Sequence, residues 1–193
     1  MKNIIEISRI TKETQIKLRL SLKPSFPSKI KTEIGFLNHM LEIFSYHSGI
    51  SLEISAKGDI EVDYHHTVED IGITLGEALY QALGERKNIA RFGDAIIPLE
   101  DALSQAVIDL AKRPYLHFEA RFPTEKIGNF DTELIEEFFR ALVFNARFTL
   151  HLRNFYGKNS HHIAESLFKA FAYAFKKALL PVEKEILSTK GTL

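Results

Sequence analysis

The chain of 193 residues contains no cysteine. Disulfide bonds and thiolate metal sites are therefore excluded, and any transition metal must be held by His and carboxylate side chains. The chain also has no excess of charge, because 25 Lys and Arg residues balance 25 Asp and Glu residues. This balance gives no reason to expect nucleic acid or a membrane surface as a partner. No segment approaches the roughly 20 apolar residues of a membrane span, and we expect a soluble, cytoplasmic protein.

The sequence repeats itself. The motif His-His-x-x-Glu occurs at residues 65–69 and again at residues 161–165, a spacing of 96 residues. Earlier in each copy, Leu37 corresponds to Ile135 at a spacing of 98 residues. A loop that is two residues shorter in the second copy accounts for the difference. An internal repeat of this kind predicts two similar structural units.

The hydrophobic pattern of each unit predicts strands followed by two helices. Alternating apolar residues predict half-buried strands at residues 16–22, 52–56 and 148–152. Helical patterns cover residues 36–46 and 132–145, and the two His-His-x-x-Glu motifs open the longest helices, with Asp63 and Ser160 as expected N-caps. We predict an α+β fold of two halves, residues 1–92 and 93–193, which form one compact unit because no Gly-, Pro- or Ser-rich linker separates them. Each half is expected to be a mostly antiparallel sheet with two helices on one face, like domain 2 of ribosomal protein S5.

The helix that begins near His161 is apolar on most of its sides. Phe168, Phe171 and Phe175 share one side, and alanines leave little polar surface elsewhere. Helices of this kind are usually covered on most sides. This composition favours packing against other subunits.

The paired motifs predict metal ligands. Residues four positions apart share one face of a helix, so the first His and the Glu of a motif can hold one ion while the second His points elsewhere. Two ions could each take a His and a Glu from one motif and the second His from the other. A single doublet could equally be a solvent-exposed helix start, but two equivalent copies favour a metal site, and imidazole with carboxylate suits manganese, iron or zinc. The six residues are His65, His66, Glu69, His161, His162 and Glu165.

One further ligand is predicted in each half. His39 lies on the helix that precedes the first motif, and Glu137 occupies the equivalent position 98 residues later. A carboxylate can also bind a hard divalent ion. The alternative for Glu137 is an exposed helix carboxylate beside Glu136.

These motifs resemble those of the imidazoleglycerol-phosphate dehydratase family in its monofunctional form, and the resemblance covers nearly the whole chain. Several long segments in the right order are more specific than one short pattern. The matching segments are RITKETQI (9–16), GFLNHML (35–41), HHTVEDIGITLGEAL (65–79), IARFG (89–93), KRPYL (112–116), GKNSHHIAESLFKAFA (157–172) and STKGTL (188–193).

The resemblance implies a duplicated α+β fold, two Mn²⁺ ions per active site and self-association into a 24-mer with sites between subunits. Seven family metal ligands fall on His39, His65, His66, Glu69, His161, His162 and Glu165. The eighth family ligand is a His, and this chain has Glu137 in its place. The departure adds a negative charge beside one metal.

The implied reaction is the dehydration of imidazoleglycerol phosphate, a small phosphorylated imidazole, to imidazoleacetol phosphate in histidine biosynthesis, through an imidazolate bound to two manganese ions. The resemblance suggests Glu13 as the general acid or base, with His39 also close to substrate. His47 is a candidate substrate contact or proton shuttle, because a histidine can titrate near neutral pH. Without the resemblance, Glu13 would be interpreted as a solvated residue at a strand end. The alternative for His47 is an exposed residue before the turn at Ser48 and Gly49. The implied phosphate-binding residues are Arg91, Arg113, Lys169, Ser188 and Lys190.

Two other functions use the same ligand set. A two-metal hydrolase of phosphate esters would release free phosphate, which a dehydratase does not. A metal-binding structural assembly would bind the ions without turning over the substrate.

Overall fold

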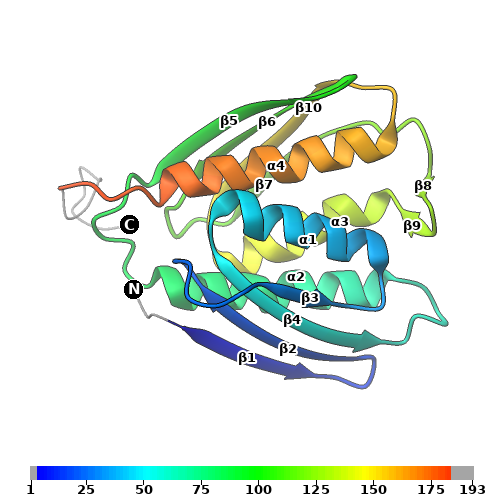
Figure 1. The fold of residues 1–193 in the computed structure, drawn as a ribbon, viewed down its shortest axis with the longest axis horizontal. Helices are drawn as coiled ribbons and strands as arrows, with labels where there is room; N and C mark the ends of the chain where they lie inside the picture. The colour runs from blue at the N-terminus through cyan, green and yellow to red at the C-terminus, as the bar shows by residue number, and fades with distance from the viewer. Residues whose placement is uncertain (1–3, 184–193) are drawn as a thin grey trace.

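The first half of the chain folds into a four-stranded sheet covered on one face by two helices. The computed structural model describes residues 4–183, drawn in Figure 1. The sheet has the order β1-β2-β4-β3, with β3 parallel to β4 and the other neighbours antiparallel. Its elements are β1 (Ile5–Ile10), β2 (Thr14–Ser21), β3 (Lys29–Lys31), α1 (Gly35–Ser48), β4 (Ser51–Gly58) and α2 (His65–Leu83).

The second half repeats this arrangement. Its sheet has the order β5-β6-β10-β7, again with one parallel pair, β7 and β10. A small hairpin of β8 and β9 precedes α3. The elements are β5 (Phe92–Leu99), β6 (Ala102–Asp109), β7 (Tyr115–Glu119), β8 (Lys126–Ile127), β9 (Phe130–Asp131), α3 (Glu133–Ala146), β10 (Thr149–Tyr156) and α4 (Ser160–Ala178). The predicted duplicated α+β fold with mostly antiparallel sheets is therefore confirmed.

The change in repeat spacing has the expected structural cause. From the end of β4 at Gly58 the chain takes seven residues to reach His65, whereas from the end of β10 at Tyr156 it takes five to reach His161. The loop before the second motif is thus two residues shorter. The predicted division at residues 92 and 93 lies at the start of β5.

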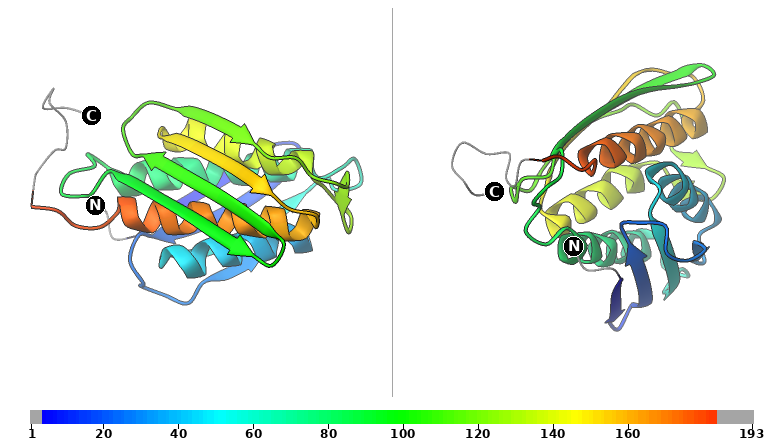
Figure 2. Two further views of the ribbon diagram at one scale, coloured as in Figure 1. Left: turned by 90° about the horizontal axis from the view of Figure 1, so that it is seen from above. Right: turned by 60° about the vertical axis from the view of Figure 1, so that its left-hand side comes forward.

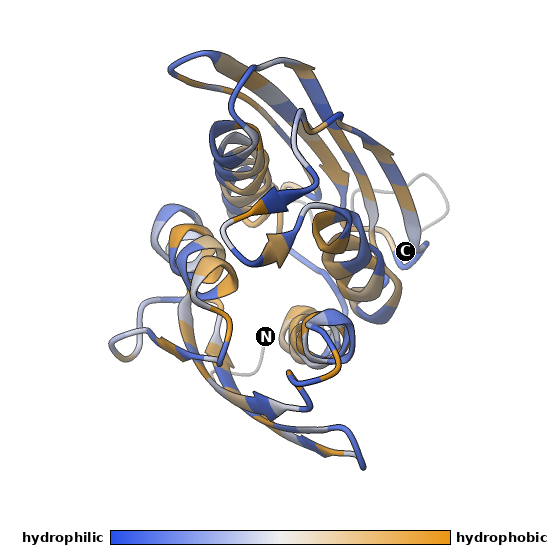
Figure 3. Cartoon of the chain, turned by 90° about the vertical axis from the view of Figure 1, so that its right-hand side faces the viewer, coloured by the Kyte–Doolittle hydropathy of each residue, from blue (hydrophilic) through white to orange (hydrophobic). Residues whose placement is uncertain are grey.

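The four helices form two layers between the two sheets (Figures 1 and 3). Helix α2 packs on α3, and α1 packs on α4. All four helices run in the same direction, so their N-terminal ends gather at one end of the molecule (Figure 1). Figure 2 shows the second sheet lying over α3 and α4. Both His-His-x-x-Glu motifs consequently lie at the same end, because each opens a helix.

Two glycines allow α2 and α3 to approach closely. A Cβ added at Gly72 would lie 2.9 Å from the backbone oxygen of Phe138, and one added at Gly76 would lie 2.6 Å from that of Leu142. Real Cβ atoms do not come this near to backbone oxygens. Gly72 and Gly76 therefore set the distance between α2, which carries the first motif, and α3, which carries Glu137.

Helix α4 is covered by its own chain. It packs on β5, β6 and β10 on one side and on α1 on the other. Phe168, Phe171 and Phe175 are at most 1% exposed, and the ring of Phe171 stacks on that of Phe44. The apolar surface of this helix is accounted for within one chain, so it no longer argues for subunit packing, and packing of α4 against other subunits stays a prediction.

The helix starts differ in part from expectation. Asn159, not Ser160, caps α4, and its side chain accepts hydrogen bonds from the backbone N–H groups of His161 and His162. In the first half Asp63 accepts from the backbone N–H of His65 at 2.7 Å, although Tyr64 is the N-cap residue. Within residues 4–183, no helix is both long enough and apolar enough to cross a membrane.

Candidate active site

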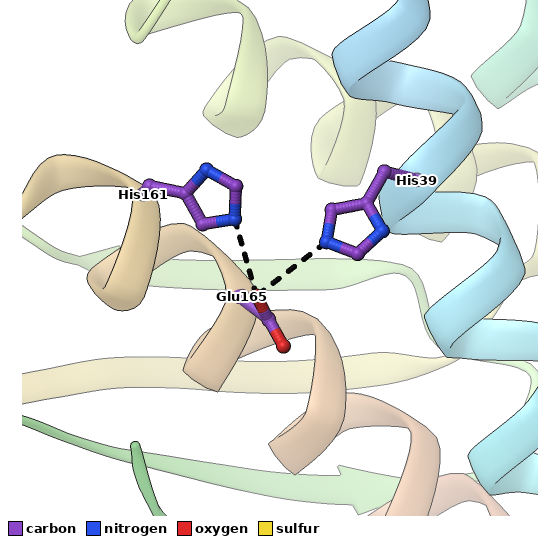
Figure 4. Close-up of side chains that lie close together, drawn as sticks. All are labelled: His39, His161 and Glu165. Carbon is purple, nitrogen blue, oxygen red and sulfur yellow. Dashed lines mark hydrogen bonds and ion pairs between the residues drawn. The ribbon is translucent and has the colours of Figure 1, made fainter. Parts of the chain in front are cut away.

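His39, His161 and Glu165 form the first cluster of metal-ligating side chains (Figure 4). Nε2 of His39 lies 3.5 Å and Nε2 of His161 lies 3.2 Å from the same oxygen, Oε2 of Glu165. The residues come from α1 and α4, which pack side by side. The cluster thus joins the two halves of the chain.

The carboxylate of Glu165 stays ionised at neutral pH. Burial acts to raise its pKa, but the hydrogen bond and charge of Lys169, with the imidazoles of His39 and His161, hold the pKa below its ordinary value. Nζ of Lys169 lies 2.7 Å from Oε1 of Glu165. One carboxylate oxygen therefore contacts the ammonium, and the other faces the two imidazoles.

His65, Glu69 and Glu137 form the second cluster. They come from α2 and α3, the other pair of packed helices. Nε2 of His65 lies 3.8 Å from Oε2 of Glu69. Glu137 is 13% exposed at its side chain and forms an ion pair with Arg140 one turn further along α3.

The two clusters occupy equivalent positions in the duplicated fold. His39 is the fifth residue of the 14-residue helix α1, and Glu137 is the fifth residue of the 14-residue helix α3. In each cluster this residue meets the first His and the Glu of the motif from the other half. In each cluster the ligand atoms of its three residues lie within 4.8 Å of one another.

The second histidine of each motif lies outside both clusters of its own chain. Nδ1 of His66 lies 3.0 Å from a carboxylate oxygen of Asp59, and Nδ1 of His162 lies 2.5 Å from one of Asp101. These hydrogen bonds raise the pKa of both histidines above the ordinary value. The hydrogen bond with His162 is also the main cause that holds the pKa of Asp101 below its usual range. Within one chain, the structure does not bring a second histidine to the cluster of the other motif.

Sequence reasoning missed Asp59 and Asp101. Asp59 lies in the loop between β4 and α2, close to its histidine in sequence. Asp101 lies in the turn between β5 and β6, 61 residues before His162. An Asp shortly before the first motif is a weak signal, and no spacing rule could have indicated Asp101.

Glu13 lies beside the first motif. It sits in the turn between β1 and β2, and its Oε1 is 3.9 Å from Nε2 of His66. The turn is anchored to α2 through Asp70, which accepts hydrogen bonds from Nε of Arg9 at 2.8 Å and from the hydroxyl of Thr14 at 2.5 Å. Arg9 and Thr14 of the RITKET segment and Asp70 of the HHTVED segment therefore hold the turn that carries Glu13 against α2. In the other half, Oε2 of Glu100 lies 3.9 Å from Nε2 of His162.

Two of the predicted phosphate ligands share one carboxylate. Arg91, in the left-handed backbone region with a φ of 67°, donates from Nε to Asp109 at 2.7 Å. Arg113 contacts the same carboxylate at 3.3 Å and is 67% exposed at its side chain. Lys169 instead contacts Glu165 of the first cluster. Ser188 and Lys190 lie outside the described residues.

His47 lies further along the α1–α4 contact than the first cluster. Its Nδ1 is 3.2 Å from the hydroxyl of Tyr173, with the direction of the proton set by the tautomer. Burial, then the charge of Lys169, lowers the pKa of His47 below its ordinary value. The side chain is thus neutral at neutral pH and can accept or pass on a proton.

The two clusters fit a hard or borderline divalent cation. Imidazole nitrogens and carboxylate oxygens are the ligands that Mn²⁺, Fe²⁺ and Zn²⁺ share, and no soft ligand is present in the chain apart from two methionines. Three ligands per cluster also leave further coordination positions, as an ion that binds substrate requires. The fold and these clusters define a duplicated α+β protein with two symmetrically placed His/Glu sites.

Comparisons with known proteins place the chain more narrowly. Residues 32–175 match the family model of imidazoleglycerol-phosphate dehydratase. Proteins of that name are 49% identical in Acetivibrio thermocellus, over all of both chains, and 52% identical in Streptococcus sanguinis, over 97% of this chain and 98% of the other. The solved dehydratase structure from Staphylococcus aureus has a TM-score of 0.85 at 45% identity and covers 93% of this chain and 99% of its own. That from Pyrococcus furiosus has a TM-score of 0.85 at 37% identity and covers 97% and 100%.

The chain therefore belongs to the imidazoleglycerol-phosphate dehydratase family. It is an enzyme of the hydro-lyase class with a dehydratase role in histidine biosynthesis.

Proposed function

We propose that this enzyme dehydrates imidazoleglycerol phosphate to imidazoleacetol phosphate with two Mn²⁺ ions in each active site. The observation that carries the proposal is the pair of His/Glu clusters at equivalent positions in a chain of this family. The residues that would hold the ions are His39, His161 and Glu165 in one cluster and His65, Glu69 and Glu137 in the other.

The second histidine of each His-His-x-x-Glu motif supports an active site that is shared between subunits. His66 and His162 each use Nδ1 for an Asp of their own chain, which leaves Nε2 as the nitrogen that can bind a cation. Neither reaches a cluster of its own chain. Each can complete a cluster of a neighbouring copy, so the proposal includes a large homo-oligomer, with the 24-mer implied by the resemblance as the expected size.

Bound divalent cations would supply the positive charge that lowers the pKa of a coordinated ring nitrogen and orients the substrate. The chain's own residues must then move a proton. Loss of water removes a hydroxyl from the carbon beside the ring and a hydrogen from the next carbon, which gives an enol that becomes the ketone. We assign removal of this hydrogen, as a proton, to a carboxylate oxygen of Glu13. The anchored β1–β2 turn holds Glu13 beside His66, the second histidine of the first motif.

The phosphate of the substrate needs fixed positive charge. Arg91 and Arg113 are held together by Asp109, so their guanidinium groups form one basic site. Guanidinium groups can bind phosphate oxygens through paired hydrogen bonds. We assign these two residues to the phosphate, with Lys169, Ser188 and Lys190 as further contacts.

The test is an assay of purified protein with Mn²⁺ and imidazoleglycerol phosphate, in which ketone formation and free phosphate are followed together. We expect ketone without free phosphate, loss of turnover with a chelator, and recovery on adding Mn²⁺. Release of phosphate would indicate a phosphate-ester hydrolase. Metal binding without any turnover would indicate a structural metal assembly.

A further inference from the structure

The two cation sites differ by one ligand. At the fifth position of its helix, the first cluster has the imidazole of His39 and the second has the carboxylate of Glu137. The first cluster therefore offers two nitrogens and one carboxylate, and the second offers one nitrogen and two carboxylates. With neutral imidazoles, the second cluster carries one more negative charge.

This difference changes which metal each site prefers. Carboxylate oxygens are hard ligands that suit Mn²⁺ and Mg²⁺, whereas imidazole suits Zn²⁺, Ni²⁺ and Cu²⁺. The extra charge of Glu137 attracts all divalent ions alike. The loss of an imidazole nitrogen, by contrast, weakens Zn²⁺ binding more than Mn²⁺ binding. The advantage that Zn²⁺ has at most sites is therefore smaller at the second cluster.

Arg140 provides a counter-charge for the extra carboxylate. Its guanidinium forms an ion pair with Glu137, whose side chain is mostly buried, while Arg140 itself is 60% exposed. A cation that binds Glu137 must share or displace this contact. In the first cluster Lys169 contacts Glu165, so each cluster has a basic side chain on one of its carboxylates.

We propose that the cluster of His65, Glu69 and Glu137 is the more manganese-selective of the two sites, and that Arg140 sets its affinity by competing with the ion for Glu137. The inference rests on the proposed function in one respect, namely that both clusters bind divalent cations. It adds that the two ions of one active site are not equivalent.

Displacement of Mn²⁺ by Zn²⁺ tests the selectivity. The intact protein is loaded with Mn²⁺ and titrated with EPR-silent Zn²⁺, and the signal of released Mn²⁺ is followed. We expect two steps, with half-displacement concentrations separated by about tenfold or more. In Glu137→His, the later step should shift to the Zn²⁺ concentration of the earlier step. Glu136→Gln, which removes a neighbouring exposed carboxylate outside the cluster, should keep the two steps.

A second pair of variants assigns the steps. His161→Ala should abolish the early step and leave the late one, because it removes a ligand of the nitrogen-rich cluster. Arg140→Gln should raise the Mn²⁺ affinity of the late step about threefold or more, since a competing positive charge is lost. Thermal unfolding in the presence of a chelator checks that each variant is folded.

The outcomes separate the two proposals. Displacement of all Mn²⁺ in a single step from the wild-type protein, or two steps that persist unchanged in Glu137→His, would overturn the inference while leaving a two-manganese enzyme in place. Absence of Mn²⁺ binding at either cluster would overturn both the inference and the proposed function.

Discussion

At the scale of single residues, the site depends on carboxylates that orient histidines. The carboxylates of Asp59 and Asp101 each accept a hydrogen bond from Nδ1 of the second histidine of a motif. Such a contact fixes the tautomer and the ring orientation of a histidine that binds metal through its other nitrogen. The same arrangement occurs in both halves although the aspartates come from different elements.

Replacement of Asp101 by Asn should weaken Mn²⁺ binding without unfolding the protein. Loss of a partner of this kind typically costs about 10- to 100-fold in metal affinity. Titration of the metal-free protein with Mn²⁺, followed by EPR, measures the effect. Asp94→Asn is the matched control, because Asp94 lies on β5 and contacts only Lys177 among the ion pairs of the described residues. Equal affinities in the two variants would show that Asp101 does not position His162.

The ion pair of Arg91 and Asp109 makes stability depend on pH. Burial acts to raise the pKa of Asp109, but the hydrogen bond and charge of Arg91 outweigh it and hold the pKa below its ordinary value. Because the folded pKa is the lower one, the ionised carboxylate stabilises the fold above about pH 4, and this contribution is lost as the pH falls through the folded pKa.

Asp109→Asn should accordingly lower the free energy of unfolding at neutral pH by about 1–3 kcal/mol. The difference from the wild type should shrink as the pH falls below 4. Urea unfolding at several pH values measures both effects. A difference that stays constant down to the lowest pH would show that the ionised form of Asp109 is not responsible.

The sequence was enough to predict the residues of the two clusters but not all of their neighbours. The two His-His-x-x-Glu motifs form a pattern in the sequence. His39 and Glu137 could be predicted because they occupy equivalent positions in the repeat. Asp101 could not be predicted, because it lies in the β5–β6 turn, 61 residues before His162 in the sequence. The contact of Lys169 with Glu165 follows i,i+4 spacing and could have been predicted beside its assigned phosphate role.

At the scale of elements, the close contact of α2 and α3 positions the second cluster. Gly72 and Gly76 leave no room for a Cβ against α3. The helix pair in turn carries His65 and Glu69 on one side and Glu137 on the other. A change in the distance between these helices at Gly76, about two turns along α2 from Glu69, should thus alter metal binding at the second cluster.

Gly76→Ala should lower stability by about 1–3 kcal/mol, the usual cost of inserting a methyl group into a well-packed contact. It should also weaken Mn²⁺ binding at the second cluster more than at the first. Gly35→Ala is the control, since a Cβ there meets no atom within 4 Å. Denaturant unfolding and Mn²⁺ titration measure the two effects, and a neutral result for Gly76→Ala would contradict this account of the helix contact.

Helices and strands were predicted well where periodicity was strong. Residues 36–46 and 132–145 lie within or within one residue of α1 and α3. The cap of α4 was misassigned because Asn159 and Ser160 are both good cap residues, and only the backbone conformation distinguishes them. The covering of α4 by its own sheet and α1 could not be predicted, because periodicity does not say which surface covers an apolar helix.

At the scale of the whole molecule, duplication explains the layout of the site. Two similar halves face each other through their helices, so each cluster draws side chains from both halves. The repeat in the sequence was enough to predict this duplicated fold. The pairing of α1 with α4 and of α2 with α3 was not predictable, because it depends on packing between the halves.

His66 and His162, which lie outside both clusters of their own chain, predict that assembly and metal binding are linked. Removal of metal with a chelator should lower the sedimentation coefficient, and Mn²⁺ should restore it. A double variant, His66→Ala with His162→Ala, should stay at the smaller size in Mn²⁺, because it lacks the ligands offered to neighbours. Analytical ultracentrifugation measures this. A monomer that is fully active with Mn²⁺ would contradict the shared site.

The number of manganese ions per chain tests the central claim most directly, which is that the two halves converge on two cation sites that support dehydration. Metal analysis of the Mn²⁺-loaded, desalted protein should give two ions per chain, and about one in His161→Ala or Glu69→Ala, with turnover of imidazoleglycerol phosphate falling together with the metal content. Full turnover in a variant that lacks both His161 and Glu69, or in chelator-treated protein without manganese, would contradict the account.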